Sequence, residues 1–277
     1  MNIAVIGAGT MGAGIAQVFA SAGHDVLLCD MSLELAQRGR GIIEKNLRRQ
    51  AEKGRLKPEE AEAALARVTP GLSDGAAGCA LILEAVAERM DVKRALFGQL
   101  DKLCPAGTVF ASNTSSLSLT ELSLGLSRPV VGMHFFNPAP VMALVEVISG
   151  LTTPKDLADR VYELARSLGK EPVRVREAPG FVVNRILIPM INEAVFTLSE
   201  GVADAESIDR AMKLGANHPI GPLALADLIG LDVVLSICET LQREFGDDKY
   251  RPAPLLRQMV RAGRLGRKSG GGFYDYN

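Results

Sequence analysis

The stretch of sequence that decides the fold is MNIAVIGAGTMGAGIAQVFASAGHDVLLCD, residues 1–30. Residues 2–6 form a short, apolar and β-branched run, which is typical of a strand buried on both faces. The glycine-rich segment GAGTMG follows at residues 7–12, and residues 11–20 have the composition of a helix with little polarity. Residues 24–28 are apolar again, and the stretch ends on an aspartate. This order of strand, glycine turn, helix, strand and acid predicts a βαβ unit.

The glycine turn and the start of the following helix are typical of a dinucleotide-binding site. Gly7 permits a tight turn, Gly9 lets the backbone approach a pyrophosphate, and Gly12 lets the helix pack close to the strand. At Thr10 and Met11, the N–H groups and the positive end of the helix dipole would face the phosphates. A tight turn without any ligand is the alternative, and the agreement of strand, helix and acid around the turn argues against it.

The aspartate that ends the stretch indicates which dinucleotide is bound. Asp30 would accept hydrogen bonds from the adenosine ribose hydroxyls and would repel a 2′-phosphate. The next residues, Met31 and Ser32, supply no cation for such a phosphate. The sequence therefore predicts NAD rather than NADP as the cofactor.

Length and composition restrict the class of protein. A chain of 277 residues can bury a sizeable core and is expected to form two domains. With 47% apolar residues, 23% charged residues and a net charge of −1, the chain is predicted to be globular and not to bind nucleic acid as its main partner. Residues 181–198 are the most apolar long stretch, but they include Arg185 and Glu193, so no membrane span is expected.

Cysteine usage and the start of the chain bear on the compartment. The four cysteines lie far apart, without CxxC pairs or metal-like spacing, and are interpreted as small buried hydrophobes: Cys29, Cys79, Cys104 and Cys238. No signal peptide fits, because the predicted nucleotide strand starts at residue 2. A cytoplasmic protein without a bound metal is expected.

The chain up to about residue 180 alternates strand-like and helical segments. Further strands are predicted at residues 80–86, 108–112, 130–136, 144–148 and 172–175, and helices at residues 91–103 and 153–168. The second helix is expected to be capped by Thr152 or Thr153, with Pro154 in its first turn. The alternation predicts a doubly wound, mostly parallel α/β sheet of the Rossmann type, in a nucleotide-binding domain over residues 1–180.

Residues 33–67 are predicted to form a helical hairpin inserted between strands of this domain. Helical periodicity covers residues 33–53, and Lys57 and Pro58 start a second helix that runs to about Arg67. One side of the hairpin is strongly basic. A solvated helix face and a docking surface for a polyanion both explain this charge, and the pattern alone does not separate them.

Beyond residue 180 only helical segments are predicted, at residues 181–200, 205–213, 223–245 and 254–262, so residues 181–277 form an all-α domain. The segment 181–198 is apolar nearly all round and must be covered on every side, which a second subunit would do. The glycine-rich tail after residue 269 cannot continue a helix. A homodimer through this domain is expected.

A general base would be needed if a nicotinamide cofactor oxidises an alcohol, and histidine suits that task near neutral pH. His24 lies in the turn before the second strand, and His218 precedes a proline between helices. His134 lies near the end of the predicted strand 130–136, where ligands bind in open α/β sheets. It is therefore the candidate base.

Glu146 is the candidate partner of this histidine. It stands alone in the apolar run at residues 143–148, where a carboxylate is costly unless it is paired. A turn with sequence Pro-Ala-Pro at residues 138–140 separates it from His134, so the two strands could lie side by side. An edge strand with Glu146 in solvent and a structural histidine is the alternative, and periodicity does not decide between them.

Other polar residues stand at the expected ends of strands. Residues 112–116, Ser-Asn-Thr-Ser-Ser, follow a strand and would line a site or simply cap a helix. Glu88 stands where a cofactor contact is expected, although a solvated acid at a helix start is equally ordinary. Asn184 would face a cleft between the domains or pair with interface backbone.

Four segments resemble the 3-hydroxyacyl-CoA dehydrogenases, most of all the short bacterial enzymes that act on 3-hydroxybutyryl-CoA. They are SNTSSL at residues 112–117, HFFNPAPVM at 134–142, LVEVI at 144–148 and PGFVVNR at 179–185. The likeness covers essentially the whole chain, and the His-Phe-Phe-Asn-Pro block is highly specific. It implies reversible, NAD-dependent oxidation of a 3-hydroxyacyl-CoA.

The resemblance implies roles for individual residues. His134 would be the general base and Glu146 its orienting partner, while Ser115 would bond the reacting oxygen and Asn184 would bind across the cleft. Positions that match cofactor contacts are Glu88, Lys93, Ser115, Asn137 and Lys268. Contacts to the coenzyme A substrate match Asn46, Lys53 and Ser115. The resemblance therefore implies that the basic hairpin binds the substrate.

Two other functions remain to be compared with this one. A dehydrogenase of a free hydroxy acid or sugar acid would not require the basic hairpin. A non-catalytic NAD-binding protein would be expected to have lost His134, Glu146 or Ser115, and all three are present.

Overall fold

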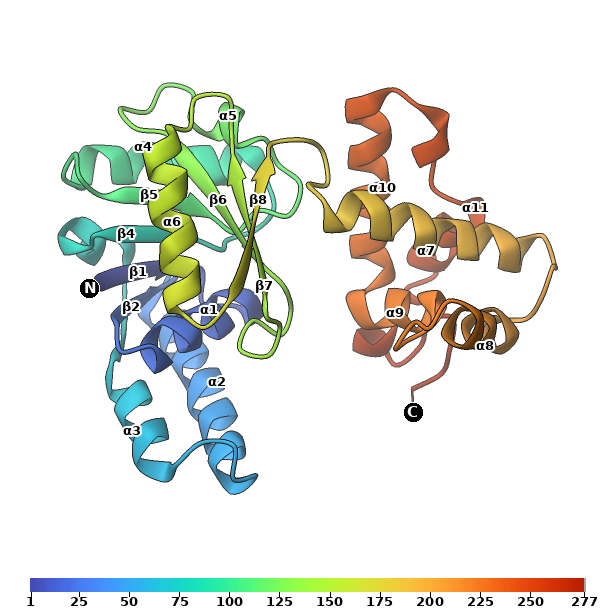
Figure 1. Ribbon diagram of the computed structural model, residues 1–277, viewed down its shortest axis with the longest axis horizontal. Coiled ribbons are helices and arrows are strands. Elements are labelled where there is room, and N and C mark those ends of the chain that lie inside the picture. The colour runs from blue at the N-terminus through green and yellow to red at the C-terminus, as the bar shows by residue number, and fades with distance from the viewer. Residues whose placement is uncertain (277) are drawn as a thin grey trace. The chain divides into compact units, whose positions relative to one another are not determined.

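The computed structural model describes residues 1–276, so Asn277 of the expected second domain lies outside it. The chain divides into two compact units, one ending at Ala178 and the other beginning at Pro179. In Figure 1 the first unit runs from blue to yellow and the second from gold to red. Within residues 1–276 no helix has the length and apolar character that crossing a membrane requires.

The first unit is built on one eight-stranded sheet with the order β3-β2-β1-β4-β5-β6-β7-β8. The strands are β1 (Asn2–Ile6), β2 (Asp25–Cys29), β3 (Val68–Gly71), β4 (Leu81–Glu84), β5 (Val109–Ser112), β6 (Val130–Phe135), β7 (Leu144–Ser149) and β8 (Glu171–Arg176). All neighbouring pairs are parallel except β6 and β7. The predicted doubly wound, mostly parallel sheet is confirmed.

Helices cover both faces of this sheet because alternate strand residues point to opposite sides. They are α1 (Thr10–Ser21), α2 (Leu33–Glu52), α3 (Pro58–Ala66), α4 (Met90–Leu103), α5 (Leu119–Leu122) and α6 (Lys155–Ser167), with a 3₁₀ turn η1 (Ser73–Gly78). Ile3 and Val5 of β1 join a core with α1, α2 and α6. Phe110 of β5 packs on Phe97 of α4, with ring centroids 5.4 Å apart.

The predicted helical hairpin is present as α2 and α3, which pack on each other and extend away from the sheet (Figure 1). Ser32 caps α2 by accepting a hydrogen bond from the Leu35 amide at 3.2 Å. Pro58 occupies the first position of α3, as expected.

One strand of the first unit was not predicted, and one predicted helix cap needs correction. The strand β3 has the sequence VTPG, too short and too rich in turn formers to be recognised; its proline is tolerated because β3 is an edge strand. The helix α6 begins at Lys155 after Pro154, without a side-chain cap. The hydroxyl of Thr153 instead accepts a hydrogen bond from the Gly150 amide at 2.9 Å, so it closes the preceding turn.

The second unit is helical, as predicted. Its helices are α7 (Val183–Ser199), α8 (Ala205–Gly215), α9 (Pro222–Ile229), α10 (Leu231–Phe245) and α11 (Pro254–Arg261), with 3₁₀ turns η2 (Asp248–Tyr250) and η3 (Arg267–Ser269). Apolar side chains of α7, α9, α10 and α11 form one core. The single helix predicted over residues 223–245 is wrong, because Gly230 has a φ of +104° and separates α9 from α10.

The glycine-rich tail packs back onto α9. The buried carboxylate of Asp227 accepts hydrogen bonds from the Phe273 and Tyr274 amides, at 3.0 and 2.9 Å. A Cβ on Gly272 would lie 1.9 Å from this carboxylate, and one on Gly266 would lie 2.3 Å from the Asp227 carbonyl. The close approach of backbone to Asp227 therefore requires glycine at these positions.

Candidate active site

The sheet order brings four strand ends together at one edge of the first unit. Ile6 of β1 pairs with Glu84 of β4, Glu84 with Ser112 of β5, and Ser112 with Gly132 of β6. The segments that follow these strands are the glycine turn, the Glu88 segment, the serine-rich turn and the loop after His134. Ligands of open α/β sheets bind outside the carboxyl ends of the strands. Several predicted site residues gather at this edge, among them the glycine turn, Glu88, Ser115 and His134.

The three glycines of the turn differ in their surroundings. Gly7 has a φ of +102°, and a Cβ there would lie 2.5 Å from the Ala85 carbonyl oxygen. A Cβ on Gly12 would lie 1.6 Å from the Gly7 carbonyl oxygen, so α1 packs directly on the turn. A Cβ on Gly9 would meet nothing within 4 Å, which leaves this backbone open on its outer side. The turn is therefore tight inside and accessible outside.

The first turn of α1 fits the phosphates of a dinucleotide. Thr10 and Met11 begin the helix, and Gly9 precedes it without a side-chain cap. By contrast, Ser32 caps α2. An uncapped helix start offers backbone N–H groups and the positive end of the dipole to an anion. The site thus has the open backbone and the donors that NAD needs.

Asp30 lies directly after β2 and is bonded to the glycine turn. One carboxylate oxygen accepts a hydrogen bond from the Ala8 amide at 2.7 Å, and the other accepts one from the Met31 amide at 2.7 Å. These bonds fix the carboxylate beside the turn. An ionised carboxylate accepts about four hydrogen bonds, so the predicted contact to ribose hydroxyls is compatible with both.

His134 and Glu146 lie opposite each other on the antiparallel strands β6 and β7. Nδ1 of His134 lies 2.8 Å from Oε2 of Glu146, and both side chains are buried. The alternative of Glu146 in solvent is excluded. A histidine held through Nδ1 by a carboxylate has a fixed tautomer and a stabilised imidazolium form.

The serine-rich turn after β5 closes around Glu88. One oxygen of the Glu88 carboxylate accepts hydrogen bonds from the Thr114 hydroxyl at 2.6 Å and from the Ser115 amide at 2.8 Å. The Ser115 hydroxyl lies 3.2 Å from the same oxygen, and the Ser116 amide lies 3.1 Å from it. The side chain of Glu88 is 35% exposed, but its carboxylate also organises the turn that carries Ser115.

Lys93, predicted to contact the cofactor, is 1% exposed. Its ammonium group lies 2.5 Å from the Glu84 carboxylate and 3.1 Å from that of Glu88. Glu84 also accepts hydrogen bonds from the Ser112 hydroxyl at 2.6 Å and the Val86 amide at 2.7 Å. Sequence reasoning missed Glu84, although it is a lone acid in an apolar strand, the signal that identified Glu146.

The two carboxyl groups beside Lys93 differ in pKa. Burial raises the pKa of Glu84, and the charge of Lys93 and the hydrogen bonds offset this only in part. Burial also acts to raise the pKa of Glu88. There, the charge of Lys93 and the hydrogen bonds from Thr114 and Ser115 prevail and hold the pKa below its usual value.

The loop between β6 and β7 carries Asn137 and is held by a lysine that sequence reasoning also missed. The buried ammonium group of Lys170 donates hydrogen bonds to the carbonyls of Ala139 and Met142, at 2.7 and 2.8 Å. A Cβ on Gly14 of α1 would lie 3.3 Å from the Ala139 side chain. The loop therefore packs between α1 and Lys170. Asn137 itself is exposed, and its contact to the cofactor stays a prediction.

The basic face of the hairpin is mostly solvated. Arg38, Lys45, Arg49 and Lys53 are exposed, and Asn46 is partly buried. Arg40 differs, because it donates hydrogen bonds to the carbonyls of Val68 and Leu65. This geometry is compatible with both explanations of the charge, so the substrate contacts of Asn46 and Lys53 stay predictions.

Two predicted site residues belong to the second unit. Asn184 lies in the first turn of α7 and is buried. Lys268 lies in η3 and forms an ion pair with Asp232 of α10, with the charged atoms 2.5 Å apart.

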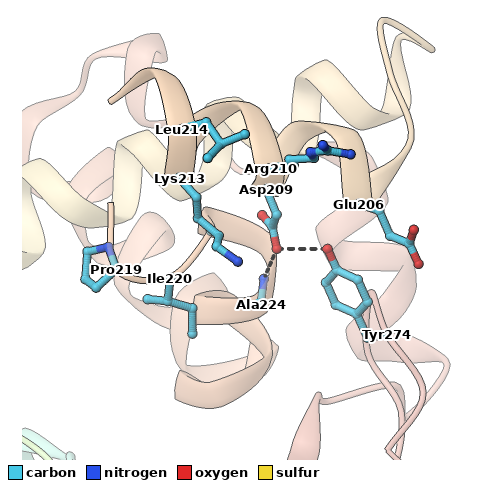
Figure 2. A pocket seen from close by; sticks show the side chains of 10 residues that line it. Glu206, Asp209, Arg210, Lys213, Leu214, Pro219, Ile220, Ala224 and Tyr274 are labelled. Atoms are coloured by element: carbon cyan, nitrogen blue, oxygen red, sulfur yellow. Dashed lines mark hydrogen bonds between the residues drawn. The ribbon is translucent and has the colours of Figure 1, made fainter. Parts of the chain in front are cut away.

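The second unit also contains a pocket between α8, the start of α9 and the tail (Figure 2). Asp209 accepts hydrogen bonds from the amides of Leu223 and Ala224 and from the Tyr274 hydroxyl, at 2.8, 2.9 and 2.9 Å. Burial and the neighbouring Asp209 raise the pKa of Tyr274. The carboxylate thus caps α9 and holds the tail. Among residues 1–276, no group of three or more His, Cys, Asp or Glu side chains could hold a metal ion.

The fold and the site define the class of this protein: an NAD-binding oxidoreductase with a Rossmann-type domain followed by a helical domain. The model of the 3-hydroxyacyl-CoA dehydrogenase NAD-binding domain matches residues 2–178, and the model of the C-terminal domain of the same family matches residues 180–276. The chain belongs to the 3-hydroxyacyl-CoA dehydrogenase family. The predictions of the family and of NAD are confirmed.

Individual relatives agree with this assignment over the whole chain. A 3-hydroxybutyryl-CoA dehydrogenase of Clostridioides difficile is 55% identical, with 100% of both chains covered. A 3-hydroxyadipyl-CoA dehydrogenase of Escherichia coli is 46% identical over 99% of this chain and 59% of its own length. The crystal structure of (S)-3-hydroxybutyryl-CoA dehydrogenase PaaH1 from Ralstonia eutropha has a TM-score of 0.95 at 49% identity, covering 100% of this chain and 99% of that one.

Proposed function

We propose that this enzyme catalyses the reversible, NAD-dependent oxidation of a short-chain 3-hydroxyacyl-CoA, 3-hydroxybutyryl-CoA in particular, to the 3-ketoacyl-CoA. The observation that carries the proposal is the buried pair of His134 and Glu146, 2.8 Å apart, at the edge of the sheet where the glycine turn also lies. The choice of a four-carbon acyl group is supported by relatives of that name at 49% and 55% identity.

In the proposed reaction His134 is the general base. Its Nδ1 faces Glu146, so we assign proton transfer to Nε2. As the O–H bond of the 3-hydroxyl group breaks, Nε2 takes the proton, and the electron pair forms the carbonyl while hydride leaves C3. When bound, NAD would supply the acceptor for this hydride. Glu146 stabilises the imidazolium, which donates the proton back in the reverse direction.

The remaining site residues are proposed to bind and orient. Ser115 bonds the reacting oxygen, and Asn184 binds on the side of the second unit. The glycine turn, Thr10 and Met11 hold the pyrophosphate, and Asp30 holds the adenosine ribose. Glu88, Lys93, Asn137 and Lys268 are proposed for the nicotinamide side. Asn46 and Lys53 are proposed to bind the coenzyme A moiety.

A homodimer in the cytoplasm completes the proposal. Ile186 on α7 is 69% exposed, and its neighbours Leu187, Pro189 and Met190 are only partly buried, which leaves an apolar strip that a second copy would cover. The four cysteines are all unpaired and buried, which suits a reducing compartment.

One assay tests the proposed reaction. Acetoacetyl-CoA and longer 3-ketoacyl-CoA substrates, including a dicarboxylic one, are each incubated with NADH or NADPH. We expect the fastest oxidation with acetoacetyl-CoA and NADH. Free acetoacetate is the matched control for the coenzyme A moiety. A higher rate with free acetoacetate would favour a dehydrogenase of free acids, and no oxidation of either cofactor would refute the proposal.

A further inference from the structure

The buried acid Glu84 has no role in the reaction proposed above, yet it is among the most completely enclosed polar groups of the first unit. It ends β4, is 0% exposed and lies 2.5 Å from the ammonium group of Lys93, which is 1% exposed. A buried ion is costly unless it is paired and hydrogen-bonded. Such a pair calls for an explanation beyond the packing of an apolar strand.

Lys93 links Glu84 to the surface of the site. Its ammonium group also lies 3.1 Å from the carboxylate of Glu88, so one cation bridges two acids. Glu84 therefore does more than neutralise Lys93. It draws the ammonium group to the end of β4 and so determines where the second acid is held.

Glu88 in turn holds the turn that carries Ser115. The carboxylate oxygen that faces away from Lys93 accepts hydrogen bonds from the Thr114 hydroxyl, the Ser115 amide and the Ser116 amide. A second path runs directly from Glu84, because the Ser112 hydroxyl donates to Glu84 and accepts from the Thr114 amide at 3.1 Å. Both paths from Glu84 converge on the segment around Ser115.

We infer that Glu84 is a positioning residue for hydride transfer: through Lys93, Glu88 and Ser112 it fixes the turn that presents Ser115 to the substrate oxygen. This inference rests on the proposed role of Ser115. A carboxylate suits the task because it accepts from Lys93, Ser112 and Val86 at once and supplies the charge that keeps Lys93 buried. A displacement of under 1 Å at a positioning group is enough to slow a reaction markedly.

The test is a double-mutant cycle with Glu84→Gln and Ser115→Ala, measured as kcat and KM for acetoacetyl-CoA reduction by NADH. Glutamine keeps the shape of the side chain but removes the charge. We expect Glu84→Gln alone to lower kcat by about tenfold with little change in KM, and to lower it less than about twofold in the Ser115→Ala background. If Glu84→Gln has most of its effect on kcat only when Ser115 is present, Glu84 acts through Ser115.

Asp101→Asn is the matched control. Asp101 lies near the other end of α4, is 14% exposed and forms an ion pair with Arg128 at 2.9 Å. Its loss is expected to lower the melting temperature while leaving the effect of Ser115→Ala unchanged. If Glu84→Gln does not fold, Glu84→Asp, which keeps the charge but withdraws it from Lys93, takes its place in the cycle.

The outcomes separate the inference from the proposed function. Equal losses from the Glu84 substitution in both backgrounds, or no loss in either, would refute the positioning role while the proposed reaction stands. A Ser115→Ala enzyme with wild-type kcat would refute the role of Ser115, and the inference with it.

Discussion

Two strands of the first unit, β4 and β7, each bury an acid among apolar residues, and they differ in the partner that the acid receives. On β7, Glu146 faces the imidazole of His134; on β4, Glu84 faces the ammonium group of Lys93. Histidine ordinarily gains or loses its proton near neutral pH, whereas lysine ordinarily stays charged there. The first pair therefore suits proton transfer, and the second suits a permanent framework. The partner residue, rather than the buried acid, therefore determines whether such a pair transfers a proton or holds the structure in place.

The largest expected effect comes from removing the partner that transfers the proton. His134→Ala is expected to lower kcat by on the order of 10² to 10⁴, the usual contribution of a general base, with nearly unchanged NADH binding. Steady-state kinetics and NADH titration measure both. His24→Ala, which removes a histidine from the turn before β2, is the control and should keep wild-type kcat. An unchanged kcat in His134→Ala would show that His134 is not the general base, and the proposed difference between the His134–Glu146 and Lys93–Glu84 pairs would be wrong.

The next largest effect is expected in the framework pair, and on stability. Lys93→Met leaves two acids without their shared cation, and breaking a buried pair typically costs about 3 kcal/mol or more of unfolding free energy. Urea unfolding measures it, with Lys102→Met on the exposed side of α4 as the control. We expect a loss of about 3 kcal/mol of unfolding free energy, the lower end of the range for broken buried pairs, because the raised pKa of Glu84 lets that acid take up a proton. A loss below about 1 kcal/mol would contradict a framework role.

A smaller effect is expected when the acid that orients His134 loses its charge. Hydrogen bonds to charged groups contribute about 1.5 to 3 kcal/mol, so Glu146→Gln should lower kcat by on the order of ten- to a hundredfold. This loss lies between wild type and His134→Ala. Glu171→Gln, an exposed acid on the adjacent strand β8, provides the control for the kinetics. Wild-type turnover in Glu146→Gln would reduce Glu146 to a structural residue.

The smallest effect is a pH dependence of stability caused by Glu88. Its pKa is lowered from the ordinary 4.5, so the folded state binds fewer protons than the unfolded state just below that pH. The contribution of ionised Glu88 is therefore fully present above about pH 4.5 and is lost as the pH falls through the lowered pKa.

Because the side chain of Glu88 is 35% exposed and solvent screens its charge, Glu88→Gln should be less stable than wild type by only about 1 kcal/mol at pH 7, and the difference should shrink below pH 4.5. Chemical unfolding at pH 7, 5 and 3.5 measures this. Glu163→Gln, an exposed acid on α6, should differ from wild type by a constant amount. A deficit for Glu88→Gln that grows toward low pH would reverse the sign and contradict the geometry around Lys93.

Much of the fold follows from local patterns. The strands β1, β4, β5, β6 and β7 lie within one or two residues of the predicted runs, because buried parallel strands are continuous apolar segments. The predictions fail where the backbone conformation of a single residue ends a helix, or where a short segment becomes a strand only by pairing with an edge. Gly230 breaks a periodic apolar segment by adopting a positive φ, and β3 is a strand only because β2 offers it an edge.

The candidate site was predictable in its residue types but not in its connections. A lone acid in an apolar run identified Glu146, and the same pattern would have identified Glu84. Nothing in the sequence around Lys170 indicates that its ammonium group holds the carbonyls of Ala139 and Met142. Such bonds join residues about thirty positions apart, and periodicity carries no information at that range.

The sequence by itself determined the class of fold, the cofactor and the candidate base, because each depends on a local pattern: a glycine turn between strands, an acid after β2, and a histidine at a strand end. Only the tertiary structure decided which partner each buried acid receives. The β6–β7 register places Glu146 opposite His134, and the start of α4 delivers Lys93 to Glu84. The physical reason is that burial makes an unpaired charge costly, but packing between distant segments selects the group that neutralises it.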